Sequence, residues 1–148
     1  MSSNLIRNFA RALVQYVVPE APFQKTISTI EQQKNLPDLW CTLEFTDAGS
    51  QRLTVGVSAL WREFGSFSLV LLGKSGYGEE ELTKLGEKFE RYARDLQQRV
   101  TDPATGITGK LRIENVSPPN AEPYEDGNWA SCSVVCTYTY DSVRGAAE

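Results

Sequence analysis

The feature that most constrains the fold is a long alternation of side chains in the last part of the chain. From residue 129 to residue 140, one set of small, apolar or aromatic side chains alternates with a second set rich in serine and threonine. A period of two is typical of a β-strand, whose successive side chains point to opposite faces of a sheet. One buried and one polar face predict a long strand of antiparallel type. The first set is Ala130, Cys132, Val134, Cys136, Tyr138 and Tyr140, and the second is Trp129, Ser131, Ser133, Val135, Thr137 and Thr139.

Shorter segments with the same period predict further strands. Residues 39–46 alternate, and the alternation resumes over residues 53–57 after the turn-forming residues 47–50. Two alternating runs joined by such a turn predict a β-hairpin. Other strands are predicted over residues 26–30, 64–72 and 110–116.

Two segments carry the period of an amphipathic helix. Residues 4–18 place apolar side chains on one stripe, with Asn4 able to cap the start and Pro19 ending the helix. Residues 79–99 repeat the pattern, with glutamates in the first turn and Arg99 in the last, as the helix dipole favours. Gly86 inside this second helix costs about 1 kcal/mol relative to alanine. We therefore expect Gly86 to allow close packing of the helix on the sheet.

Together these elements predict an α+β fold, in which one mostly antiparallel sheet carries two α-helices packed on one face. A chain of 148 residues without a repeat or linker fits a single domain over residues 1–148. We expect frayed ends over residues 1–3 and 142–148. The side chains expected to be buried between sheet and helices are Leu43, Phe45, Leu69, Leu71, Phe89, Leu96, Val134 and Cys136.

Composition argues against catalysis. The chain contains no histidine, the commonest general base and metal ligand. Cys132 and Cys136 lie in one predicted strand, roughly 13 Å apart, whereas a disulfide needs under about 7 Å. With Cys41 they are expected to be core thiols, since no histidine is present to activate them. A net charge of −4 argues against a protein that coats duplex DNA. We expect no enzymatic activity, no metal and no cofactor.

Two segments that resemble functional motifs do not complete them. Gly73-Lys74-Ser75 lies between a strand and a helix, but Ser68 stands where a phosphate-binding loop needs its first glycine. The glutamates that follow would also repel a phosphate. The apolar run 13–18 is preceded by charged residues and is too short to span a membrane, so we expect no membrane association.

The remaining candidates are surfaces that bind other proteins. Tryptophan is enriched at interfaces, and the polar face of the sheet suits contact with a partner. The proline-containing segment 117–128 is expected to be an exposed loop that contacts a neighbouring subunit or another protein, with Tyr124 as its anchor. The protein-interface candidates are Trp40, Trp61, Pro118, Pro119, Tyr124 and Trp129.

Residues 60–90 and 109–141 resemble a tail terminator protein, also called a tail completion protein, of long-tailed bacteriophages. The similarity extends over residues 39–141 and does not include the polar stretch 24–35. The shared pattern consists, in chain order, of Arg62-Glu63, Gly65, an apolar strand, Gly76, Gly78, an amphipathic helix with Phe89, Pro118-Pro119, Gly127, Trp129 and the strand end Tyr138-Thr139-Tyr140-Asp141.

The resemblance implies a non-enzymatic subunit of a hexameric ring in the virion tail, assembled in the cytoplasm of the bacterial host. Such a ring caps the tail tube at its final length and then presents an attachment surface to the head. The implied partners are further copies of the chain, the tail tube protein and a neck or head-completion protein. DNA passes through the lumen only as cargo. The candidates for lining that lumen are Glu79, Glu80, Glu81, Glu122, Glu125 and Asp126.

Two other classes of protein stay open. One is another phage head–tail connector, neck or baseplate subunit, and the other is a small cellular protein-binding module or carrier. Several copies that each carry a charge of −4 repel one another, so the net charge predicts that assembly is weakened at low salt.

Overall fold

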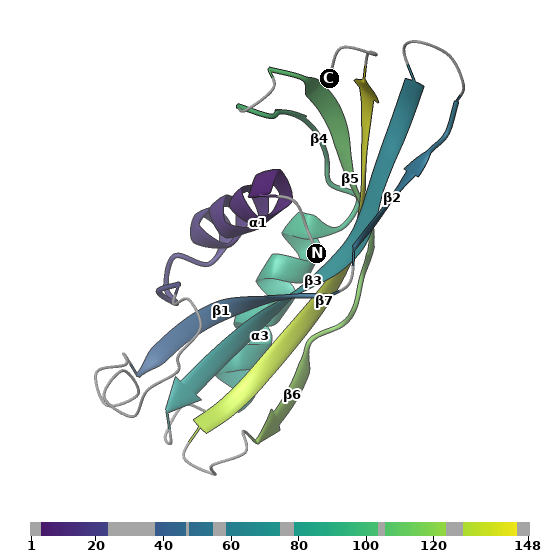
Figure 1. The fold of residues 1–148 in the computed structure, drawn as a ribbon. Coiled ribbons are helices and arrows are strands. Elements are labelled where there is room, and N and C mark those ends of the chain that lie inside the picture. Colours follow the sequence, from purple (N-terminus) through teal and green to yellow (C-terminus); the bar gives the residue numbers. More distant parts are fainter. Residues whose placement is uncertain are drawn as a thin grey trace.

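The computed structural model describes residues 4–23, 38–46, 48–54, 59–74, 79–103, 106–123 and 129–144. Within these ranges a curled, antiparallel sheet has two helices packed against it, which is an α+β fold as the sequence predicts (Figure 1). None of the helices described is long and apolar enough to cross a membrane. The elements are α1 (Asn4–Val17), β1 (Leu39–Phe45), β2 (Gly49–Arg52), β3 (Ala59–Lys74), α3 (Glu79–Ala93), β4 (Gln97–Thr101), β5 (Thr108–Val116), β6 (Asn120–Pro123) and β7 (Trp129–Arg144).

The centre of the sheet is the antiparallel pair of β3 and β7. Each strand has 16 residues, and the pairing runs from Ala59 opposite Arg144 to Lys74 opposite Trp129. The predicted strand 64–72 therefore extends at both ends. The expectation that the chain frays from residue 142 is wrong for residues 142–144, because β3 is long enough to pair with them.

Shorter strands flank this pair at its two ends. At one end of the pair, β1 pairs with β3 and β6 pairs with β7. At the other end, β2 pairs with β3, β5 pairs with β7, and β4 pairs with β5. We call these the β6 end and the β4 end. The sequence predicts a hairpin between residues 39–46 and 53–57, but residues 55–57 lie outside the described residues. In the described part, β1 pairs with β3, and β2 pairs with a separate stretch of β3 instead of with β1.

Two predicted boundaries also change. The helix predicted over residues 79–99 ends at Ala93, and Asp95 adopts a φ of 59°, the left-handed conformation that often ends a helix. Residues 97–101 then form β4 instead of the last helical turn. The predicted loop 117–128 contains β6, an edge strand that ends at Pro123, a position where proline is tolerated. The predicted strand 26–30 lies outside the described residues.

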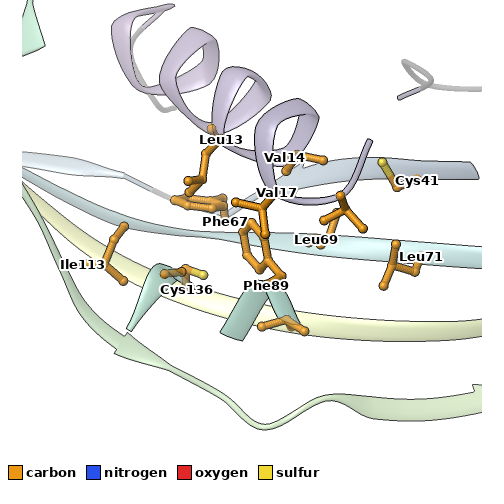
Figure 2. Packing of buried hydrophobic residues seen from close by; sticks show 14 of the residues in the cluster. Leu13, Val14, Val17, Cys41, Phe67, Leu69, Leu71, Phe89, Ile113 and Cys136 are labelled. Carbon is orange, nitrogen blue, oxygen red and sulfur yellow. The ribbon is translucent and has the colours of Figure 1, made fainter. Parts of the chain in front are cut away.

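One hydrophobic cluster joins both helices to the sheet. Helix α1 points its buried residues, including Leu13, Val14 and Val17, at Phe67 and Leu69 of β3 (Figure 2). Phe89 of α3 belongs to the same cluster and is fully buried. Of the predicted core, Leu69, Leu71, Phe89, Val134 and Cys136 are buried, and Leu43, Phe45 and Leu96 are partly buried against the cluster.

Gly86 brings α3 close to the sheet, as the sequence predicts. A Cβ atom at this position would lie 3.0 Å from the Cβ of Pro119 and 3.2 Å from the Sγ of Cys132. Both distances are shorter than ordinary van der Waals contact, so a side chain here would push the helix away. Pro119, one of the predicted interface residues, is thus half-buried beneath α3 and packs against Gly86 of the same chain.

Replacing Phe89 with alanine should lower the free energy of unfolding by about 3–5 kcal/mol, because it empties a fully buried aromatic site. Urea denaturation followed by circular dichroism measures the change. Lys84→Ala on the exposed side of α3 is the matched control and should shift stability by less than about 0.5 kcal/mol. Similar losses for both variants would contradict the assigned helix register.

Gly86→Ala should destabilise the protein although alanine favours helices by about 1 kcal/mol. Overpacking against Pro119 and Cys132 costs about 1–3 kcal/mol, which exceeds that gain. In a double-mutant cycle, Pro119→Ala should relieve part of the Gly86→Ala loss. Additive losses would show that the two residues do not interact.

Candidate protein-interaction surface

The face of the sheet opposite the hydrophobic cluster carries the even-numbered residues of β3 and the odd-numbered residues of β7. We call it the outer face. Along β7 it presents Ser133, Val135, Thr137 and Thr139, the polar set that the sequence predicts. Several of these hydroxyls are already engaged; for example, Thr139 donates to Glu114 at 2.9 Å. The outer face nevertheless differs between its two ends.

At the β6 end, the outer face carries a second, small buried cluster. Trp40, Val70 and Leu72 pack together there, and Trp40 is only 7% exposed. Trp40 was predicted as an interface residue because the alternation of β1 places it opposite the main core. The structure instead gives Trp40 a packing role, since β3 supplies apolar side chains on both of its faces at this point.

The other interface candidates are dispersed. Trp61 is half-buried and lies on the helix side of β3, and Pro118 is exposed beside the half-buried Pro119. Trp129 is the first residue of β7, but its side chain, like the whole of Tyr124, lies outside the described parts of the chain. Trp40, Trp61, Pro118 and Pro119, whose side chains the structure describes, therefore do not form one exposed site.

Among the acidic candidates, Glu80 and Glu81 are exposed in the first turn of α3. Glu80 forms an exposed ion pair with Lys84 at 3.5 Å. Glu79 lies in the same turn and Glu122 in β6, but their side chains are outside the described set, as are residues 125 and 126.

The β4 end of the outer face carries a row of charged side chains that the sequence analysis missed. The strand register sets Arg99 of β4 opposite Lys110 of β5, Lys110 opposite Asp141 of β7, and Asp141 opposite Arg62 of β3. Arg112 lies two residues further along β5, on the same face. We call Arg62, Arg99, Lys110 and Arg112 the basic patch.

Two of these cations already have an acidic partner within the chain. The guanidinium of Arg62 donates to both carboxylate oxygens of Asp141, at 2.7 and 2.9 Å, and this hydrogen bonding raises the pKa of Arg62. Arg112 lies 4.0 Å from Glu114. Arg99 and Lys110 have no ion pair with any acid among the described residues. Like charges directly opposite each other destabilise a sheet, so an external anion bound by this pair would be stabilising.

A shallow depression lies beside Arg99 and Lys110. Its volume is about 320 Å³, and it opens where β5 leaves β7 beyond Lys110. Gly109 also belongs to its lining. A Cβ atom at Gly109 would lie 2.6 Å from the backbone oxygen of Asp141, so glycine allows β5 to approach β7 closely here. The remaining lining residues are Leu60, Thr108, Asp141, Ser142 and Val143.

Apolar side chains accompany the charges at this end. Val143 is 54% exposed and Phe64 is 43% exposed, and both lie on the outer face near Arg62. Arginine mixed with exposed apolar side chains is typical of protein interfaces. Guanidinium and ammonium groups bind carboxylate or phosphate oxygens. The arrangement can therefore hold an anionic, partly apolar surface.

The sequence held one usable signal for this patch. Thr108, Lys110 and Arg112 alternate with Gly109, Leu111 and Ile113, so their common face could have been read from the period of two. Arg99 was assigned to a helix, and its position opposite Lys110 follows only from the strand register.

No model of a known protein family matches this chain, and no curated protein matches its sequence. The similarity to tail terminators therefore rests on the motif residues alone.

The three cysteines are buried free thiols. Burial raises the pKa of Cys41 and Cys136 to about 12 and that of Cys132 to about 11, so all three are neutral at neutral pH. These values disfavour a nucleophilic role, because the thiolate is the reactive form.

At pH 8 the native protein should react with Ellman's reagent at least about a hundredfold more slowly than the unfolded chain, because both access and thiolate formation are suppressed. Unfolding in guanidinium chloride should release all three thiols, which provides the control in the same sample. Rapid labelling of any thiol in the native protein would contradict the assigned burial.

Proposed function

We propose that this protein is a structural subunit of a bacteriophage tail, acting as a tail terminator and not as an enzyme. The observation that carries the proposal is that the motif residues contact one another. Arg62 binds Asp141 on the outer face, and the hydroxyl of Tyr138 donates to Glu63 at 2.8 Å on the other face. Residues from the two halves of the pattern are thus coupled across the β3–β7 pair.

Gly65 completes this arrangement. A Cβ atom at Gly65 would lie 3.1 Å from the hydroxyl oxygen of Tyr138, so glycine leaves room for the Tyr138–Glu63 hydrogen bond. Phe89, the helical member of the pattern, is buried in the cluster to which Tyr138 also belongs. The shared residues thus belong to one structural unit and not to scattered surface positions, which supports a relationship at the level of the fold.

The edges of the sheet are suited to ring assembly. In the described part of the chain, β2, β4 and β6 each pair with a single strand. Edge strands invite association with other chains, and a heterologous contact closes into a ring when its rotation allows. In this proposal six copies cap the tail tube, a neck protein binds the ring, and DNA passes through the lumen. The site of action is the virion tail, after assembly in the host cytoplasm.

The test is to add the purified protein to growing tail tubes of the same phage and to image them by electron microscopy. We expect tube growth to stop and one end of each tube to carry a ring, because a terminator binds only the end that is to receive the head. Tubes without added protein are the control and should continue to elongate.

Tubes that keep growing in the presence of the protein would refute the terminator assignment. Binding at the opposite end would instead favour a baseplate subunit, and binding to isolated heads alone would favour a neck or connector protein.

A further inference from the structure

Two groups of exposed charged side chains lie at opposite ends of the sheet. The basic patch lies at the β4 end. At the β6 end, Asp38 is exposed just before β1, which starts opposite Gly73, and Glu80 and Glu81 are exposed at the start of α3, shortly after β3 ends (Figure 1). We call Asp38, Glu80 and Glu81 the acidic rim.

The two charged regions are too far apart to neutralise each other. Arg62 and Gly73 are separated by 11 residues of one continuous strand, which corresponds to roughly 36 Å of chain. The Debye length at physiological ionic strength is about 8 Å, so solvent ions screen the attraction within one subunit. Each region therefore interacts independently with whatever approaches it.

We propose that the basic patch of one copy binds the acidic rim of a second copy, so that subunits associate head to tail. The inference rests on the proposed function in one respect, namely that a terminator ring needs a heterologous contact. Arg99 and Lys110 supply the two cations of the patch that form no ion pair with the described residues, and the depression beside them receives the carboxylates of Glu80 and Glu81.

The partner chemistry follows from the surroundings of the patch. Leu60 and the exposed Val143 line the same depression, and these apolar groups match a protein surface better than a phosphate backbone. The whole chain carries a net charge of −4, which disfavours approach to nucleic acid. The acidic rim is available, because the ion pair of Glu80 with Lys84 is solvent-exposed and such pairs contribute little stability.

Head-to-tail pairing reverses the salt dependence expected from net charge. Repulsion between copies of charge −4 predicts weaker association at low salt, whereas attraction between the patch and the rim predicts stronger association at low salt. Sedimentation velocity from low to high sodium chloride should therefore show dissociation as salt rises.

A charge-exchange experiment tests the contact directly. One variant combines Arg99→Glu with Lys110→Glu, and the other combines Glu80→Lys with Glu81→Lys. Each variant alone should self-associate about tenfold or more weakly than the wild type, because like charges then meet at every contact. An equimolar mixture should regain association, because each reversed surface then meets its complement on the other variant.

The matched control is Lys88→Glu with Arg91→Glu. It changes the net charge as much as the patch variant but at exposed positions of α3, and it should leave association within about twofold of the wild type. Far-ultraviolet circular dichroism and thermal melting verify that all variants are folded, which is expected because the four exchanged residues are exposed.

Three results would overturn the inference: a wild-type chain that stays monomeric at low salt, a patch variant that associates like the wild type, or a mixture that does not recover. Duplex DNA binding that is lost in the patch variant would also overturn it and assign the patch to nucleic acid. If the wild type caps tubes but the mixed variants do not regain association, only the inference is refuted. If the mixed variants regain association but the wild type does not cap tubes, only the proposed function is refuted.

Discussion

The antiparallel pairing of β3 with β7 is the interaction on which the rest of the structure depends. Its register directs Phe67, Leu69 and Leu71 toward the helices and, in the same strand, directs Arg62 to the outer face. A slip of one residue would exchange the two faces of a strand, exposing the core side chains and burying the cations. The packing of α1 and α3 and the position of the basic patch are therefore set by one register.

The elements predictable from sequence are those whose apolar side chains repeat with a clear period. Helix α1, helix α3 up to Ala93, and most of β7 belong to this group. Strand β4 could not be recognised, because residues 97–101 carry only one apolar side chain and Leu96 continues the spacing of the preceding helix. Strand β6 was hidden by Pro123 and by the Pro118-Pro119 pair before it. Pro123 is tolerated because β6 is a short edge strand that pairs with β7 alone among the described strands.

The surface was less predictable than the core because it is assembled from distant segments. Arg62, Arg99 and Lys110 come from three strands, and no local pattern relates them. Trp40 illustrates the opposite difficulty: alternation correctly placed it away from the main core, but Val70 and Leu72 provide a second apolar contact that a single strand does not reveal. Whether an outer-face residue is buried depends on its cross-strand neighbours, which only the topology determines.

The central pair also has a consequence for how the protein is made. It joins residues 59–74 to residues 129–144, so the contacting residues are far apart in sequence. Contacts between distant parts of a chain form slowly. During synthesis, Leu69 and Leu71 of β3 have no sheet partner on the β7 side until residues 129–144 leave the ribosome. An incomplete chain thus exposes an apolar strand that is prone to aggregation. Completion of β7 provides both the missing part of the core and Asp141, so Arg62 gains its acidic partner only when β7 pairs with β3.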